Sequence, residues 1–150
     1  MEMQTSHSQK HSWFRLVLAL CLFAVPVDVA ASIPLFGIQY DSALGVTGSY
    51  GGSLGQSASS GYKGPYLEAS IGKYGQGLDL GFGEGLFPKM SYGASVSYKH
   101  ISSSSSDFKK DNYLGISGRF GIIGMLVKVG AYQGLELDEQ KVSFSVGIGF

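Results

Sequence analysis

The sequence predicts an all-β fold, a closed antiparallel eight-stranded transmembrane β-barrel, and three observations lead to it. Apolar residues alternate with small or polar ones at a period of two, which is the spacing of the two faces of a strand. Glycine occurs 23 times in 150 residues, and long helices are disfavoured because each interior glycine costs about 1 kcal/mol relative to alanine. After residue 31 no apolar stretch reaches the length of about 20 residues that a membrane-spanning helix needs.

Residues 1–31 are expected to form a secretory signal peptide. Lys10 and Arg15 precede an unbroken apolar run at residues 16–25, and small residues follow, ending with Ala31. This order of a positive, an apolar and a small-residue region is the pattern of such leaders, and the apolar run is too short to span a membrane. We therefore expect cleavage after Ala31 and assign residues 32–150 to the barrel domain.

Eight segments between residues 36 and 150 can supply the strands. In the last of them, KVSFSVGIGF, every second residue is apolar and the residues between are Ser or Gly, apart from the first Lys. About ten residues per membrane strand would use about 80 of the residues from 32 to 150, which leaves connections of ordinary length. The segments span residues 36–40, 44–50, 66–72, 78–86, 91–99, 113–120, 125–132 and 141–150.

The connections alternate in length. Those at 87–89 and 121–124 are short, whereas those at 102–112 and 134–140 are longer and polar. Outer-membrane barrels have short turns on the periplasmic side and longer loops outside. We therefore expect the connections at 102–112 and 134–140 to face the cell exterior and those at 87–89 and 121–124 to face the periplasm. Three prolines, Pro34, Pro65 and Pro88, are expected near strand starts or in turns, where a missing N–H group is tolerated.

The charged residues of the strands fall on the small, Gly- and Ser-rich face. An eight-stranded barrel has an interior that side chains can fill, so we expect these charges to pair inside a polar lumen. Gly81, Gly83 and Gly85 are expected to leave room there for Arg119, Lys128 and Tyr132. The predicted charge cluster consists of Glu68, Asp79, Lys99, Arg119 and Lys128.

Glu84 departs from this pattern because it shares the face of Phe82 and Leu86. It would therefore lie on the lipid side, close to the short connection at 87–89. A charge near the membrane interface costs about 0–1 kcal/mol, compared with about 2–4 kcal/mol at the midplane, so this position is acceptable for a membrane barrel.

The leader, the eight alternating segments and the ending VSFSVGIGF together resemble small outer-membrane β-barrel proteins of Gram-negative bacteria. The resemblance implies location in the bacterial outer membrane, contact with its lipid and lipopolysaccharide, and recognition by the barrel assembly machinery. Since an eight-stranded lumen is filled by side chains, we further expect a structural or surface-interaction role and no catalysis. The residues that resemble the C-terminal assembly signal are Val142, Phe144, Val146, Ile148 and Phe150.

A second, more local resemblance concerns residues 96–102. This segment, VSYKHIS, is similar to the His-x-Ser segment of the lipid A deacylases, which are also eight-stranded outer-membrane barrels. The resemblance implies an acyl hydrolase in which His100 activates Ser102 and a carboxylate orients the imidazole. Asp107 or Asp111 could supply that carboxylate only if the loop after Ser102 folds back. The sequence departs from the family because Ser103, not Asn, follows this serine and no Glu lies near.

Composition limits the remaining functions. The 11 basic and 11 acidic residues balance, so a strongly basic nucleic-acid binder is excluded. After residue 31 the chain has one histidine and no cysteine, and we expect neither a metal site nor a cofactor. A soluble periplasmic barrel resembling the lipocalins, with an apolar ligand inside, is the second alternative to the membrane barrel.

Overall fold

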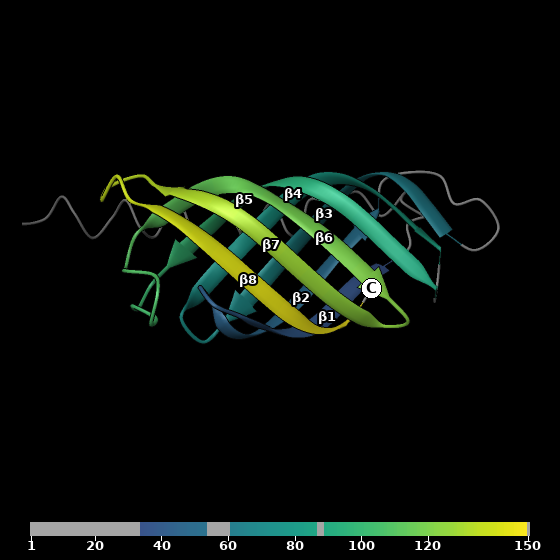
Figure 1. Ribbon diagram of the computed structural model, residues 1–150, viewed down its shortest axis with the longest axis horizontal. Coiled ribbons are helices and arrows are strands. Elements are labelled where there is room, and N and C mark those ends of the chain that lie inside the picture. Colours follow the sequence, from purple (N-terminus) through teal and green to yellow (C-terminus); the bar gives the residue numbers. More distant parts are fainter. Residues whose placement is uncertain (1–33, 54–60, 87–88, 150) are drawn as a thin grey trace, which may run out of the picture. The chain divides into compact units, whose positions relative to one another are not determined.

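A computed structural model describes residues 34–53, 61–86 and 89–149, which form one closed antiparallel β-barrel (Figure 1). The prediction of an eight-stranded antiparallel barrel is confirmed. Its strands are β1 Pro34–Asp41, β2 Gly45–Ser53, β3 Gly61–Gly72, β4 Gly75–Leu86, β5 Met90–Ile101, β6 Asn112–Ile122, β7 Met125–Gly134 and β8 Gln140–Gly149. The proposed leader, Pro88 and Phe150 lie outside the described residues.

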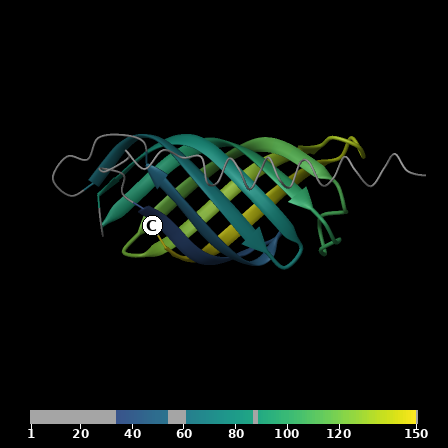
Figure 2. The same cartoon turned by 180° about the vertical axis from the view of Figure 1, so that it is seen from behind.

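Each strand pairs with its neighbours in sequence, and β1 pairs with β8 to close the barrel. The strands cross the barrel obliquely, with β6 to β8 in front in Figure 1 and β1 to β4 in front in the opposite view (Figure 2). No helix in the described part of the chain has the length and hydropathy needed to cross a membrane.

The two ends of the barrel differ. The connections 42–44, 73–74, 102–111 and 135–139 lie at one end, which we call the loop end. The other end, the turn end, holds the tight β6–β7 turn and the last residue of β8. Ile123 and Gly124 both have positive φ, 48° and 79°, which is the backbone that a two-residue hairpin with right-handed strand twist requires.

Along the strands the exposed residues are apolar and the buried ones are mostly small or polar. In β1, for example, Phe36, Ile38 and Tyr40 are exposed, whereas Gln39 and Asp41 are buried. Every strand places at least one large apolar side chain on the outside. The barrel is therefore apolar outside and polar inside, the reverse of a soluble barrel.

Two apolar clusters close the ends of this polar interior. The cluster at the turn end contains Leu35, Tyr62 and Tyr66. The cluster at the loop end contains Ala43, Leu44, Ile101, Phe108, Tyr113 and Tyr132. The charged middle of the lumen lies between these two clusters.

The inward glycines make room for residues other than those expected. A Cβ atom on Gly81 would lie 2.7 Å from the ring of Tyr66, and one on Gly85 would lie 2.5 Å from the ring of Tyr62. These tyrosines come from β3, the neighbouring strand, and not from the far wall of the barrel. The expectation that the three glycines of β4 accommodate Arg119, Lys128 and Tyr132 is therefore wrong; Gly115 and Gly130 accommodate Tyr132 instead.

Pro65 also lies elsewhere than expected, inside β3 and opposite Phe82 of β4. It is tolerated because the described pairing between β3 and β2 ends at Tyr66, one residue away. Pro65 is paired only with β4 in the described structure. The lack of a backbone N–H group at Pro65 therefore removes no described hydrogen bond between β3 and β2.

Candidate functional site: the charged lumen and its loop-end cap

Four charged side chains from four strands meet in the middle of the lumen. Glu68 of β3 accepts a hydrogen bond from Arg119 Nη1 at 2.6 Å and a second one from Lys128 Nζ. Lys128 also lies 3.1 Å from Asp79 Oδ2. Glu68 is 1% exposed and Arg119 is 4% exposed, so this network is shielded from water. In such surroundings each charge would be costly alone and is stabilised by its partners.

A second ion pair lies nearer the loop end. Lys99 Nζ is 2.8 Å from Asp41 Oδ2 and donates a hydrogen bond to Ser143 Oγ, also at 2.8 Å. It also lies 4.7 Å from the centre of the Tyr132 ring, a cation–π contact. Lys99 thus has the inward position expected of it, but its partner Asp41 is absent from the predicted cluster.

The signal that could have found Asp41 is the alternation of Phe36, Ile38 and Tyr40, which places Asp41 on the inner face. With Asp41 included, the buried cluster has three carboxylates, Asp41, Glu68 and Asp79, and three cations, Lys99, Arg119 and Lys128. The charges of this six-residue cluster therefore balance; the other buried carboxylate of the described residues, Asp111, lies beneath the loops.

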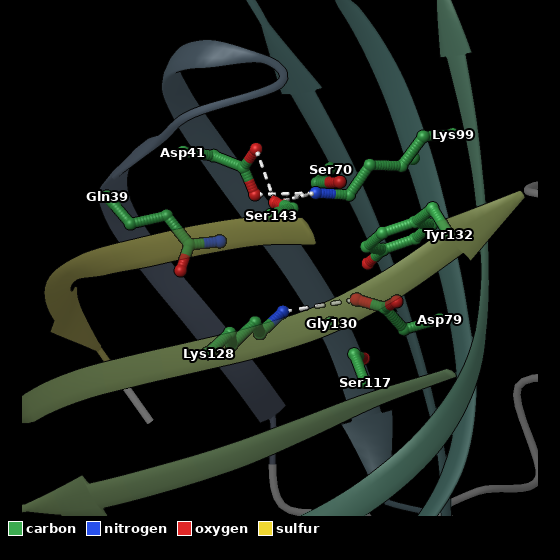
Figure 3. Close-up of a pocket in the computed structure, with 11 residues that line it drawn as sticks. Gln39, Asp41, Ser70, Asp79, Lys99, Ser117, Lys128, Gly130, Tyr132 and Ser143 are labelled. Atoms are coloured by element: carbon green, nitrogen blue, oxygen red, sulfur yellow. Dashed lines mark hydrogen bonds and ion pairs between the residues drawn. The ribbon is translucent and has the colours of Figure 1, made fainter. Parts of the chain in front are cut away.

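Hydroxyl groups fill the space between the ions. Ser97 donates to Asp79, and Ser117 lies 2.7 Å from the hydroxyls of both Ser95 and Ser97. Figure 3 shows hydroxyl groups of this kind, those of Ser70, Ser117 and Ser143, among Lys99, Lys128 and Tyr132. The free space among them is about 10 Å³, the lower limit for one water molecule. Among the described residues, this part of the lumen therefore has almost no free space.

The loop at 102–111 folds back over the barrel mouth. Phe108 is fully buried there, with its ring edge-on to Tyr113 at 5.1 Å and to Tyr132 at 6.4 Å. The Ser105 hydroxyl accepts a hydrogen bond from the Phe108 amide and donates one to the Ser42 carbonyl. The loop therefore closes the lumen with an aromatic side chain.

Asp111 ties this loop to the neighbouring one. Its carboxylate accepts hydrogen bonds from the backbone N–H groups of Asn112, Glu136 and Leu137. At the surface of the same loops Lys109 bonds Glu139. This hydrogen bond lowers the pKa of Glu139 and raises the pKa of Lys109, because each charged form stabilises the other.

The candidate hydrolase residues are not joined by hydrogen bonds. His100 Nδ1 lies 2.8 Å from the side-chain oxygen of Asn112, whereas the Ser102 hydroxyl donates to the Tyr74 carbonyl at 3.1 Å. Asp111 is buried and occupied by the loop amides. The three residues thus have separate partners in this structure.

The residues of the proposed assembly signal follow the expected alternation as far as the structure describes them. Val142, Phe144, Val146 and Ile148 are exposed on the outer face of β8. Phe150 lies outside the described residues, and the recognition of this ending stays a prediction.

Glu84 lies on the outer face near the turn end, where its carboxylate contacts two polar side chains. Lys63 of β3 lies directly opposite, 3.3 Å away, and the Tyr92 hydroxyl of β5 donates to the same carboxylate at 2.8 Å. The three side chains form a polar group across three adjacent strands.

Within residues 34–53, 61–86 and 89–149 no three His, Cys, Asp or Glu side chains lie together in a way that could hold a metal ion. Comparison with known proteins finds no match among family models, curated proteins or solved structures.

Proposed function

We propose that the protein is a small integral outer-membrane β-barrel with a filled polar lumen, serving a structural or surface-interaction role and no catalytic one. The observation that carries this proposal is the inversion of the barrel. All eight strands expose large apolar side chains, while the described ion pairs between strands, apart from the Lys63–Glu84 pair near one end, lie inside.

The energetics of this arrangement favour a membrane over water. Ile38, Ile71 and Val142 are 63%, 72% and 69% exposed, and covering such a side chain fully is worth about 1.5–3 kcal/mol. Monomeric soluble proteins rarely expose apolar patches larger than a few hundred Å². A belt on all eight strands needs a cover, and lipid hydrocarbon supplies one on every side.

The positions of the polar groups are also consistent with a membrane. The Lys63–Glu84–Tyr92 group lies near the turn end and the long polar loops lie at the other end. Short turns on the periplasmic side and longer loops outside are typical of outer-membrane barrels. We infer that the loop end faces the exterior, where it would meet lipopolysaccharide and any surface partner.

The described part of the lumen leaves little room for the ligand that the soluble alternative requires. A lipocalin-like barrel holds an apolar molecule in an apolar interior, whereas this lumen is lined by ions and hydroxyls around a free space of about 10 Å³. That space is at the lower limit of what one water molecule needs. The described interior therefore favours the membrane barrel.

The first test is location together with barrel folding. We expect the chain to fractionate with outer membranes, to resist carbonate and high salt, and to migrate faster on a gel when unheated than when boiled. Closed membrane barrels resist unfolding in detergent, which causes the shift in mobility. Recovery from the soluble periplasm would contradict the proposal and favour the lipocalin-like alternative.

The second test concerns the chain ending. Deleting Phe150, or replacing it with a charged residue, is expected to reduce the amount of folded barrel in the membrane and to expose the chain to periplasmic proteases. The physical reason is that the alternating apolar ending forms the terminal strand that we expect the assembly machinery to recognise. A control is Ile123→Ser at the exposed β6–β7 turn. Equal yields for both variants and the parent would count against the assembly role.

The third test concerns hydrolysis. We expect no loss of an acyl chain from lipid A when the purified, folded protein is incubated with it, because Ser102 is bonded to a carbonyl and not to His100. Mass spectrometry of lipid A from cells with and without the protein provides the measurement. Loss of one acyl chain, abolished by both His100→Ala and Ser102→Ala, would establish the enzyme instead.

A further inference from the structure

A polar group interrupts the apolar outer face of the barrel near the turn end. Lys63, Glu84 and Tyr92 are register partners on β3, β4 and β5. Toward the turn end the next outward residue of β4 is Leu86, and toward the middle of the barrel it is Phe82; both are exposed. The polar group therefore lies inside the apolar belt, with apolar side chains on both sides of it along the strand.

This polar group is not saturated by its own contacts. Lys63 Nζ and the Tyr92 hydroxyl both contact the same carboxylate oxygen of Glu84, Oε2, at 3.3 Å and 2.8 Å. Among the described residues nothing bonds the other oxygen, Oε1, and an ammonium group can donate three hydrogen bonds. The side chains of Lys63 and Glu84 are 69% and 35% exposed, so these free valences are accessible from outside. Ionisable groups within a membrane typically face a partner.

The two opposite charges make this surface complementary to itself. Two copies that enter one membrane in the same direction are related by a two-fold axis only if that axis is parallel to the membrane normal. An axis between Lys63 and Glu84 places the lysine of each copy opposite the glutamate of the other. Strands about 4.8 Å apart and tilted by about 35–45° put register partners within about 3 Å of the same depth, a difference that a lysine side chain covers.

The surface beside the ion pair allows two barrels to approach. The next outward register pairs of β3 and β4 are Pro65–Phe82 and Leu67–Leu80, and all four side chains are apolar. In hydrocarbon such a surface gains little from contact with another apolar surface, so polar contacts determine where two chains meet. Four alternating charges shielded from water attract each other more strongly than they would in solvent.

A lipid headgroup is a less suitable partner for this polar group. To reach both charges, its phosphate and its ammonium group would have to pass Leu86 and enter the apolar belt, where charges are costly. A second copy has its charges at the required depth by symmetry.

We propose that β3 and β4 form a two-fold interface with a second copy of the chain in the membrane, in which Lys63 of each copy binds Glu84 of the other. This inference rests on the proposed membrane location. The test uses the full chain in vesicles of phosphatidylethanolamine and phosphatidylglycerol with a large excess of lipid. A donor or acceptor fluorophore on Ser104→Cys, an exposed residue at the loop end, reports association as energy transfer, and Cys21→Ser keeps this thiol the only one.

Charge reversal distinguishes contacts between copies from contacts within one copy. Lys63→Glu alone and Glu84→Lys alone should each reduce energy transfer to the level of random encounter, because either homodimer would bring four like charges together. An equal mixture of the two variants should restore the transfer of the parent, because mixed pairs have opposite charges. Neither variant can re-form the ion pair within its own chain, so this recovery requires contact between copies.

A milder variant and a matched pair complete the test. Glu84→Gln removes one charge without repulsion and should also reduce energy transfer, and it tests the interface if a reversal variant fails to fold. The control is the loop-end ion pair of Lys109 and Glu139, whose side chains are 62% and 29% exposed. Lys109→Glu, Glu139→Lys and their mixture should all show the transfer of the parent.

The outcomes separate this interface from the membrane barrel itself. A parent that fails to enter vesicles or to show heat-dependent mobility would refute the membrane barrel. A folded parent with random transfer, or a mixture of Lys63→Glu and Glu84→Lys without recovery, would refute the interface. Phosphatidylethanolamine bound to a monomeric parent in native mass spectrometry, and lost in both reversal variants, would assign the polar group to a lipid headgroup instead.

Discussion

Replacing Arg119 by alanine is expected to lower the free energy of unfolding by about 3–5 kcal/mol, the cost of breaking a buried ion pair from one side. Glu68 would keep Lys128 but lose the 2.6 Å bond from Arg119 in a site where its carboxylate is 1% exposed. The Arg119 guanidinium also lies 5.3 Å from the centre of the Tyr66 ring, and this contact would be lost too. Urea unfolding of the barrel in detergent micelles measures the change.

Lys109→Ala is the control for this prediction. Lys109 also pairs with a carboxylate, Glu139, but its side chain is 62% exposed. Its loss should leave the urea midpoint almost unchanged, because water replaces an exposed partner. Equal midpoints for Arg119→Ala and Lys109→Ala would show that the lumen network does not stabilise the fold.

Much of the barrel follows from the sequence because one physical rule, the alternation of strand faces, acts on every strand. Glu68, Asp79 and Lys128 have inner positions since each stands between outward apolar neighbours. Asp41 follows the same rule, but it is the last residue of a short strand, where the pattern ends and is least evident. Its role depends on Lys99, which is 58 residues away in the chain.

The alternation does not determine which residues face each other across strands. The Gly81–Tyr66 contact depends on the register of β3 against β4, which pairs these two residues directly. The period of two gives the face of a residue but not its neighbour on the next strand. The inward direction of the β4 glycines is compatible with neighbours from the far wall of the barrel. Their actual neighbours, Tyr62 and Tyr66, come from the adjacent strand β3.

The same parity explains why the hydrolase residues separate. His100 pairs with Asn112 across β5 and β6, and both side chains lie on the outer face. Asp111 immediately precedes Asn112 in the chain and is buried beneath the two loops. A shift of one residue reverses the direction of a side chain, so Asp111 cannot orient His100 while this register holds.

Phe108 is the residue that the sequence could least predict, because it lies within the polar loop at 102–111. It is buried because the loop end leaves an apolar hollow between the β1–β2 turn, Ile101 and two inward tyrosines, Tyr113 and Tyr132. No pattern in the loop itself predicts that hollow, which exists only once the barrel is closed.

Phe108→Ala is expected to lower the free energy of unfolding by about 3–5 kcal/mol, the usual cost of removing a buried phenylalanine. The ring is fully buried and edge-on to both tyrosines, so its loss opens a cavity at the barrel mouth and removes the contact that holds the loop down. Phe108→Leu should lose less, because much of the buried apolar volume remains. Leu135→Ala, at a loop residue that is 58% exposed, is the matched control and should stay within about 0.5 kcal/mol of the parent. If urea unfolding gave Phe108→Ala the same midpoint as Leu135→Ala, the loop would not be sealing the lumen.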